Sequence, residues 1–121
     1  MRGENVDAGG SGEEIAARYL LLSGYRILER NYRAGRLEID IIAERDRCLV
    51  FAEVKMRRSS TFGSALESIL PKKLDRIRDA ALAYLSEKGF GTEEEIRIDL
   101  IAIDLESDKK RMILNHLQGV T

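Results

Sequence analysis

The sequence predicts an α/β domain in which a mixed β-sheet is flanked by helices. Two stretches repeat apolar residues at helical spacing, and five others alternate apolar and polar side chains or are rich in β-branched residues. Along the chain these stretches follow the order helix, three strands, helix, two strands. At 121 residues, with 44% of them hydrophobic, the chain is long enough for one core and one domain.

The domain is expected to begin at residue 12, after a short lead-in. Residues 1–11 are small, polar and rich in glycine, which is typical of a disordered segment. From Glu13, apolar residues recur at helical spacing until Ser23 and Gly24, and they predict a helix of about three turns. Residues 12–121 are therefore interpreted as a single domain.

Three strands are expected after this helix. Residues 25–33 alternate apolar and polar side chains, whereas residues 37–43 and 48–54 are runs rich in Ile, Val and Phe. The charged residues 44–47 suit a hairpin turn, so the second and third strands are expected to be antiparallel neighbours.

The second half of the chain is expected to add one helix and two strands. Residues 57–61 are polar without periodicity and predict a loop. The apolar residues within 65–85 fit a long amphipathic helix, which Pro71 should break or kink. Strands are expected over residues 96–105 and 112–117.

The overall composition points to no particular partner. Charged residues make up 34% of the chain, but they nearly balance, and the formal net charge is -1. The single cysteine, Cys48, excludes an internal disulfide and is interpreted as a strand residue, while the single histidine, His116, is expected at a strand end or on the surface. Because no secretory signal and no membrane-spanning apolar run is found, a cytoplasmic protein without a membrane partner is expected.

Charged residues inside otherwise apolar strands give the strongest indication of chemistry. Such residues are costly to bury unless they are paired or bind an ion. Glu53 and Lys55 are two residues apart in one strand, so they project from the same face. Asp40, with Glu38 two residues before it, lies in the neighbouring strand. A hairpin between the two strands would bring Asp40 close to Glu53.

Two carboxylates and one ammonium group at one place predict a site for Mg²⁺ or Mn²⁺. These cations prefer oxygen ligands, keep several waters and often bind a substrate phosphate as well. Lys55 would orient or deprotonate an attacking water, or neutralise charge in the transition state. The alternative is a structural salt bridge on a solvent-facing sheet, because a Glu-x-Lys triplet arises readily by chance in a chain this rich in both residues.

The same residues resemble a known nuclease signature. Asp40 followed by Glu53-Val54-Lys55 is similar to the PD-(D/E)xK motif, whose αβββαβ setting matches the order expected above. A longer series resembles the YraN family of bacterial proteins, which are related to archaeal Holliday-junction resolvases. The matching positions are residues 12–20, 24–28, 31–33, 38–43, 50–51, 53–55 and 62–63, Lys73, Arg76 and residues 97–99.

The resemblance implies a restriction-endonuclease-like core and assigns roles to individual residues. Asp40 and Glu53 would be metal ligands and Lys55 the catalytic lysine. Glu13 on the first helix would complete the acidic site, although favourable electrostatics at a helix N-terminus would also explain a carboxylate there. Glu38 would be a further acidic contributor or a strand-edge charge.

Two positions depart from the patterns that the sequence resembles. Ile39 stands where the nuclease motif has proline, a position that is commonly relaxed. Leu37 stands where YraN-like proteins usually have glycine, which puts a close backbone approach at the start of that strand in doubt. Nuclease folds also host modules that do not cut, so the fold alone does not imply the reaction.

A basic segment follows the predicted metal site. Basic residues far outnumber acidic ones between residues 55 and 78, and aromatic residues are few, so recognition of a phosphate backbone is expected rather than base stacking. A solvated helix face is the alternative. The residues expected to contact nucleic acid are Arg57, Arg58, Lys72, Lys73 and Arg76.

The sequence therefore predicts an endonuclease that uses Mg²⁺ or Mn²⁺ and acts on DNA, with branched and single-stranded DNA as candidate substrates. One alternative is a non-catalytic nucleic-acid-binding module on the same fold. Another is a protein-interaction domain in which Asp40, Glu53 and Lys55 form only salt bridges. A homodimer is compatible with each of the three.

Overall fold

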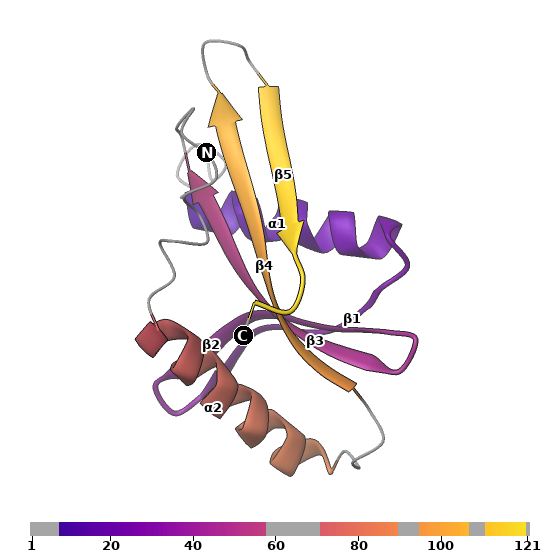
Figure 1. The fold of residues 1–121 in the computed structure, drawn as a ribbon, viewed down its shortest axis with the longest axis vertical. Helices are drawn as coiled ribbons and strands as arrows, with labels where there is room; N and C mark the ends of the chain where they lie inside the picture. The colour runs from indigo at the N-terminus through magenta and orange to yellow at the C-terminus, as the bar shows by residue number, and fades with distance from the viewer. Residues whose placement is uncertain (1–7, 58–70, 90–94, 107–110, 121) are drawn as a thin grey trace, which may run out of the picture.

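The structure, a computed structural model, describes residues 8–57, 71–89, 95–106 and 111–120. It confirms the expected order of elements (Figure 1). The elements are α1 (Ala8–Leu22), β1 (Arg26–Ala34), β2 (Leu37–Arg45), β3 (Cys48–Arg57), α2 (Pro71–Lys88), β4 (Glu95–Glu106) and β5 (Arg111–Leu117).

The five strands form one mixed sheet in the order β1-β2-β3-β4-β5. Three neighbouring pairs are antiparallel, including the predicted hairpin of β2 and β3. The β3–β4 pair is parallel. Parallel neighbours need a long crossover connection, and α2 lies in the segment that joins these two strands.

The two helices cover opposite faces of the sheet (Figure 1). Consecutive residues of β3 alternate between two buried clusters, as the two-residue period of a strand requires. Val50 and Ala52 pack with Ala16 and Leu20 of α1. Leu49 and Phe51 belong to the other cluster, which contains the buried residues of α2. β3 is thus buried on both faces.

Helix α1 begins at Ala8, earlier than the glycine-rich sequence indicated. The expected lead-in therefore overlaps the helix at residues 8–11, and residues 1–7 lie outside the described part. Gly12 is buried inside this helix, and a methyl group there would lie 3.0 Å from the Cβ of Met56 on β3. That distance is too short for an ordinary contact, so glycine at this position permits close packing of α1 on the sheet.

Pro71 begins α2 and does not interrupt it. The first position of a helix suits proline, because the missing N–H would have no helical acceptor there. Residues 65–70 of the expected longer helix, and residues 58–61 of the expected loop, lie outside the described residues. Neither helix of the described ranges is long and apolar enough to cross a membrane.

Candidate functional site

Asp40 and Glu53 lie close together, as expected from the pairing of their two strands about the hairpin turn. The β2–β3 ladder runs from Arg45 and Cys48 at the turn to Ile41 and Ala52. Just beyond its last pair, the backbone N–H of Val54 donates to Oδ2 of Asp40 at 2.8 Å. A side-chain carboxylate thus accepts a strand N–H beyond the end of the backbone ladder.

Strand β2 is irregular at Asp40. Residues two apart in a regular strand share a face. Ile39, however, packs in the cluster on the α2 face, whereas Ile41 packs in the cluster on the α1 face. Asp40 lies where the strand changes face, which allows its carboxylate to interact both with β3 and with Glu13 of α1.

Asp40 interacts with two other carboxyl groups at this place, those of Glu13 and Glu53. Burial, followed by the charge of Asp40 and a hydrogen bond with it, raises the pKa of Glu13. Burial also raises the pKa of Asp40 above its ordinary value. The pKa of Glu53 is raised to about 7, chiefly by burial and then by the charge of Asp40. The site therefore concentrates negative charge that its surroundings only partly compensate.

Two lysines supply the opposing charge. Lys73 of α2 places its Nζ 3.3 Å from Oε2 of Glu53. Lys55 is half-buried, and its charge, like that of Lys73, lowers the pKa of Glu53. The sequence predicted Lys55 beside the carboxylates, but it assigned Lys73 only to phosphate binding. No spacing rule connects residues 53 and 73, so this contact required the structure.

The donor set suits a hard divalent cation, although it does not form a complete ligand cage. Carboxylate oxygens are the ligands that Mg²⁺ and Mn²⁺ prefer, and one or two of them suffice when waters and a substrate phosphate complete the shell. Within the described ranges, no three His, Cys, Asp or Glu residues are grouped so that they could hold a metal ion by themselves. Asp40 and Glu53 would provide the protein ligands, with Glu13 beside them.

Glu38 is exposed near this site and is not part of its buried centre. Its carboxylate lies 3.8 Å from the guanidinium of Arg33 on β1. Its charge nevertheless contributes to the raised pKa values of Asp40 and Glu13. Glu38 therefore contributes to the acidity of the site from its rim.

The predicted phosphate-binding residues have different environments. Lys72 and Arg76 are exposed on α2, near Lys73. Arg57 donates from Nε to Oδ1 of Asp104 at 3.1 Å, and Asp104 is buried. Much of the charge of Arg57 is therefore compensated within the fold. Arg58 lies outside the described residues.

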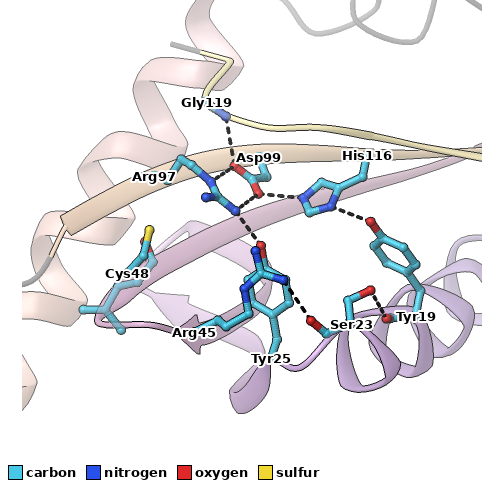
Figure 2. Close-up of polar contacts among 10 residues, drawn as sticks. Tyr19, Ser23, Tyr25, Arg45, Cys48, Arg97, Asp99, His116 and Gly119 are labelled. Atoms are coloured by element: carbon cyan, nitrogen blue, oxygen red, sulfur yellow. Dashed lines mark hydrogen bonds and ion pairs between the residues drawn. The ribbon is translucent and has the colours of Figure 1, made fainter.

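A second buried carboxylate, Asp99 on β4, was not singled out as a site from the sequence (Figure 2). Arg97 donates to both of its oxygens at 2.9 Å, and the backbone N–H of Gly119 donates at 3.0 Å. His116 contacts it from Nε2 at 2.7 Å. Burial alone would raise the pKa of Asp99, but the hydrogen bonds from His116 and Arg97 lower it.

The hydrogen bonds around Asp99 tie distant segments together. An ionised carboxylate can only accept, so His116 donates from Nε2, and its Nδ1 forms a hydrogen bond of 2.7 Å with the Tyr19 hydroxyl. Arg97 also donates to the Tyr25 hydroxyl at 2.7 Å. Figure 2 shows how this network joins α1, β4, β5 and the segment after β5. His116 lies near the end of β5, which is one of its two expected positions, a strand end or the surface. Its side chain is buried.

Comparison with known proteins places the chain in a family. A family model described as "Uncharacterised protein family UPF0102" matches residues 12–103. A UPF0102 protein of Syntrophomonas wolfei is 42% identical over 114 residues, which cover 93% of this chain and 96% of the relative. A UPF0102 protein of Chlorobium phaeobacteroides strain BS1 is 50% identical over 97 residues, covering 80% and 76% of the two chains.

Among solved structures, SfsA from Pyrococcus furiosus in complex with Ca²⁺ is 18% identical, with a TM-score of 0.34, and the match covers 87% of this chain and 60% of that one. A likeness of this extent does not establish a shared fold. The family model and the sequence relatives agree with each other over most of the chain, and they fit the YraN-like series of residues. The chain belongs to the UPF0102 family.

Proposed function

We propose that this protein is a metal-dependent endonuclease that hydrolyses phosphodiester bonds in DNA, with Mg²⁺ or Mn²⁺ as its cofactor. One observation carries the proposal. Asp40 interacts with Glu53 on the adjacent strand and with Glu13 of α1, and the pKa of each of these three carboxyl groups is raised. Carboxylates held together at such a cost are typical of a site that binds a cation.

The residues divide the chemistry between them. Asp40 and Glu53 would hold the cation, which when bound supplies electrophilic activation of the scissile phosphate. Lys55, two residues beyond Glu53 on β3, would neutralise charge that develops on the phosphate or position the attacking water. Glu13 and Glu38 add negative potential around the site.

The exposed basic residues of α2 support a nucleic-acid substrate. Lys72 and Arg76 face solvent near Lys73, whose ammonium group already reaches the acidic site. A phosphate backbone that contacts this part of α2 would lie close to Glu53. Such contacts position a substrate without reading its sequence. Arg57 and Arg58 are further candidates, although the pairing of Arg57 with Asp104 limits its contribution.

The test is cleavage of a panel of substrates in the presence of Mg²⁺ or Mn²⁺. The panel contains branched, single-stranded and duplex DNA and the corresponding RNA. Asp40→Ala should abolish both cleavage and cation binding, because it removes a ligand. Lys55→Ala should lower the cleavage rate by roughly 10²-fold while cation affinity stays the same or improves slightly, since a positive charge is lost.

A non-catalytic nucleic-acid-binding module is the second candidate. The pairing of Glu53 with Lys73 favours it, because this ion pair gives the buried carboxylate an opposing charge without a cation. Binding of nucleic acid without cleavage of any substrate would select this candidate. Absence of both cation binding and nucleic-acid binding would instead indicate a protein-interaction domain.

A further inference from the structure

The Glu53–Lys73 ion pair joins a buried group to an exposed one. The Glu53 side chain is 10% exposed, whereas that of Lys73 is 48% exposed. Lys73 is the third residue of α2, and Glu53 lies in the middle of β3. The lysine therefore extends from the solvent side of a helix terminus to a carboxylate inside the proposed site.

Lys73 and a divalent cation would compete for the same carboxylate. A buried carboxylate needs an opposing charge, and either cation can provide it. Mg²⁺ binds its oxygen ligands at about 2.1 Å. An ammonium group still in contact with Glu53 would therefore lie only about 4 Å from the cation. At that distance the repulsion between a divalent and a monovalent cation is more than about ten times the thermal energy, even at an effective dielectric constant of about 20.

We propose that Lys73 is the counter-ion of Glu53 in the cation-free protein, and that entry of a divalent cation displaces its ammonium group toward the DNA backbone. The inference rests on the proposed function. Lys73 has a flexible stem and is already half exposed, so it can turn toward Lys72 and Arg76 without movement of α2. Lys73 is thus a positioning residue and not a ligand.

This exchange couples the two ligands of the proposed enzyme. Cation binding would add one positive charge to the phosphate-binding face of α2. By thermodynamic reciprocity, a nucleic acid that captures Lys73 would raise the affinity of the site for the cation by the same factor.

Calorimetric titration of Mn²⁺ into the wild type, Lys73→Gln and Lys72→Gln tests the competition directly. Lys73→Gln should bind Mn²⁺ about tenfold more tightly than the wild type, because the competing charge is gone. Lys72→Gln is the matched control, with the same substitution one residue earlier on an exposed position, and it should bind like the wild type. Equal or weaker binding by Lys73→Gln overturns the inference.

A second measurement needs no metal and separates the inference from the proposed function. Unfolding of the wild type, Glu53→Gln, Lys73→Gln and the double variant is compared at pH 8 in EDTA. The effect of the double substitution on the unfolding equilibrium constant should differ by about fivefold or more from the combined effects of the two single substitutions. Additive effects would overturn the counter-ion role while leaving the proposed function to be judged by wild-type cation binding and cleavage. Clear coupling without Mn²⁺ binding by any protein would remove the proposed function and reduce Lys73 to a structural partner.

Discussion

Two buried carboxylates on the same sheet have opposite environments. Asp99 on β4 is completely buried and accepts hydrogen bonds from Arg97, His116 and the backbone of Gly119 (Figure 2). Glu53 on the adjacent β3 is also buried, but among the described residues its one ion-pair partner is Lys73 at 3.3 Å, and the negative charge of Asp40 is nearby. The two groups differ in the charge around them much more than in their exposure.

The difference is the one expected between a structural carboxylate and a functional one. The pKa of Asp99 is lowered, so the native state favours its ionised form. The pKa of Glu53 is raised to about 7, so the native state resists its ionisation near neutral pH. A charge that is well paired stabilises the fold, whereas a poorly compensated one destabilises it and is typical of a binding or catalytic site.

The largest expected effect is on the structural side of this comparison. Asp99→Asn removes the charge that pairs with Arg97 and His116 and should lower the free energy of unfolding by about 3 kcal/mol or more. Urea denaturation at pH 7 measures it. Asp46→Asn, in the hairpin turn and 91% exposed, is the matched control and should change stability by less than about 0.5 kcal/mol. Similar values for the two variants would show that the Asp99 network does not stabilise the fold.

The effect next in size concerns Glu53 and depends on pH. A raised pKa means that the native state binds more protons than the unfolded state between the ordinary value of 4.5 and about 7, so stability should fall as pH rises through this window. Glu53→Gln cannot ionise and should be more stable than the wild type at pH 8 by up to about 3.5 kcal/mol, at about 1.4 kcal/mol for each pKa unit between 4.5 and about 7. At pH 4 the two should be equally stable.

Chemical denaturation of both proteins across this pH range provides the measurement. Asp99 would give the opposite trend, because stability from a lowered pKa is lost only as pH falls below the ordinary range. A Glu53→Gln variant that is less stable than the wild type at pH 8 would show that Glu53 is a structural carboxylate like Asp99.

Local patterns were sufficient to predict most of the fold. Strand alternation and helical spacing gave the correct order of elements, and the β2–β3 hairpin was correctly expected to bring Asp40 to Glu53. The predicted start of α1 was wrong, because the glycines before residue 13 count as evidence against a helix, whose interior glycine usually disfavours. In the structure Gly12 lies where α1 packs closely against Met56, a contact between segments that no local pattern reveals.

The site features that were not predicted from the sequence are contacts between distant segments. Lys73 reaches Glu53 from a helix on one face of the sheet, and Tyr19 reaches His116 across 97 residues of sequence. Asp99 is preceded by Arg97 at a spacing of two, but this pair alone did not indicate a buried network. A sequence rule finds charges within one strand or hairpin, whereas burial and the number of donors require the tertiary structure.

The smallest expected effect concerns the exposed basic face of α2. Lys72 and Arg76 contact solvent in the structure, so Lys72→Gln with Arg76→Gln should leave stability within about 0.5 kcal/mol of the wild type. If both residues contact phosphates, the slope of log affinity for DNA against log salt should become shallower by about 1.8, at roughly 0.9 for each contact with duplex DNA. Fluorescence anisotropy with two unrelated DNA sequences measures the slopes, which should change equally, because backbone contacts carry no sequence information.

The matched control for this experiment is Arg18→Gln with Arg26→Gln. These arginines are also highly exposed, with side chains 75% and 74% accessible, but they lie on α1 and β1. The control removes the same number of positive charges, so a loss of affinity caused by net charge alone would appear in both double variants. A shallower slope confined to Lys72 and Arg76 would locate the DNA on the face of α2 nearest Glu53. Equal slopes in the wild type and the α2 variant would assign that face to solvent and leave the carboxylate cluster without a neighbouring phosphate-binding surface.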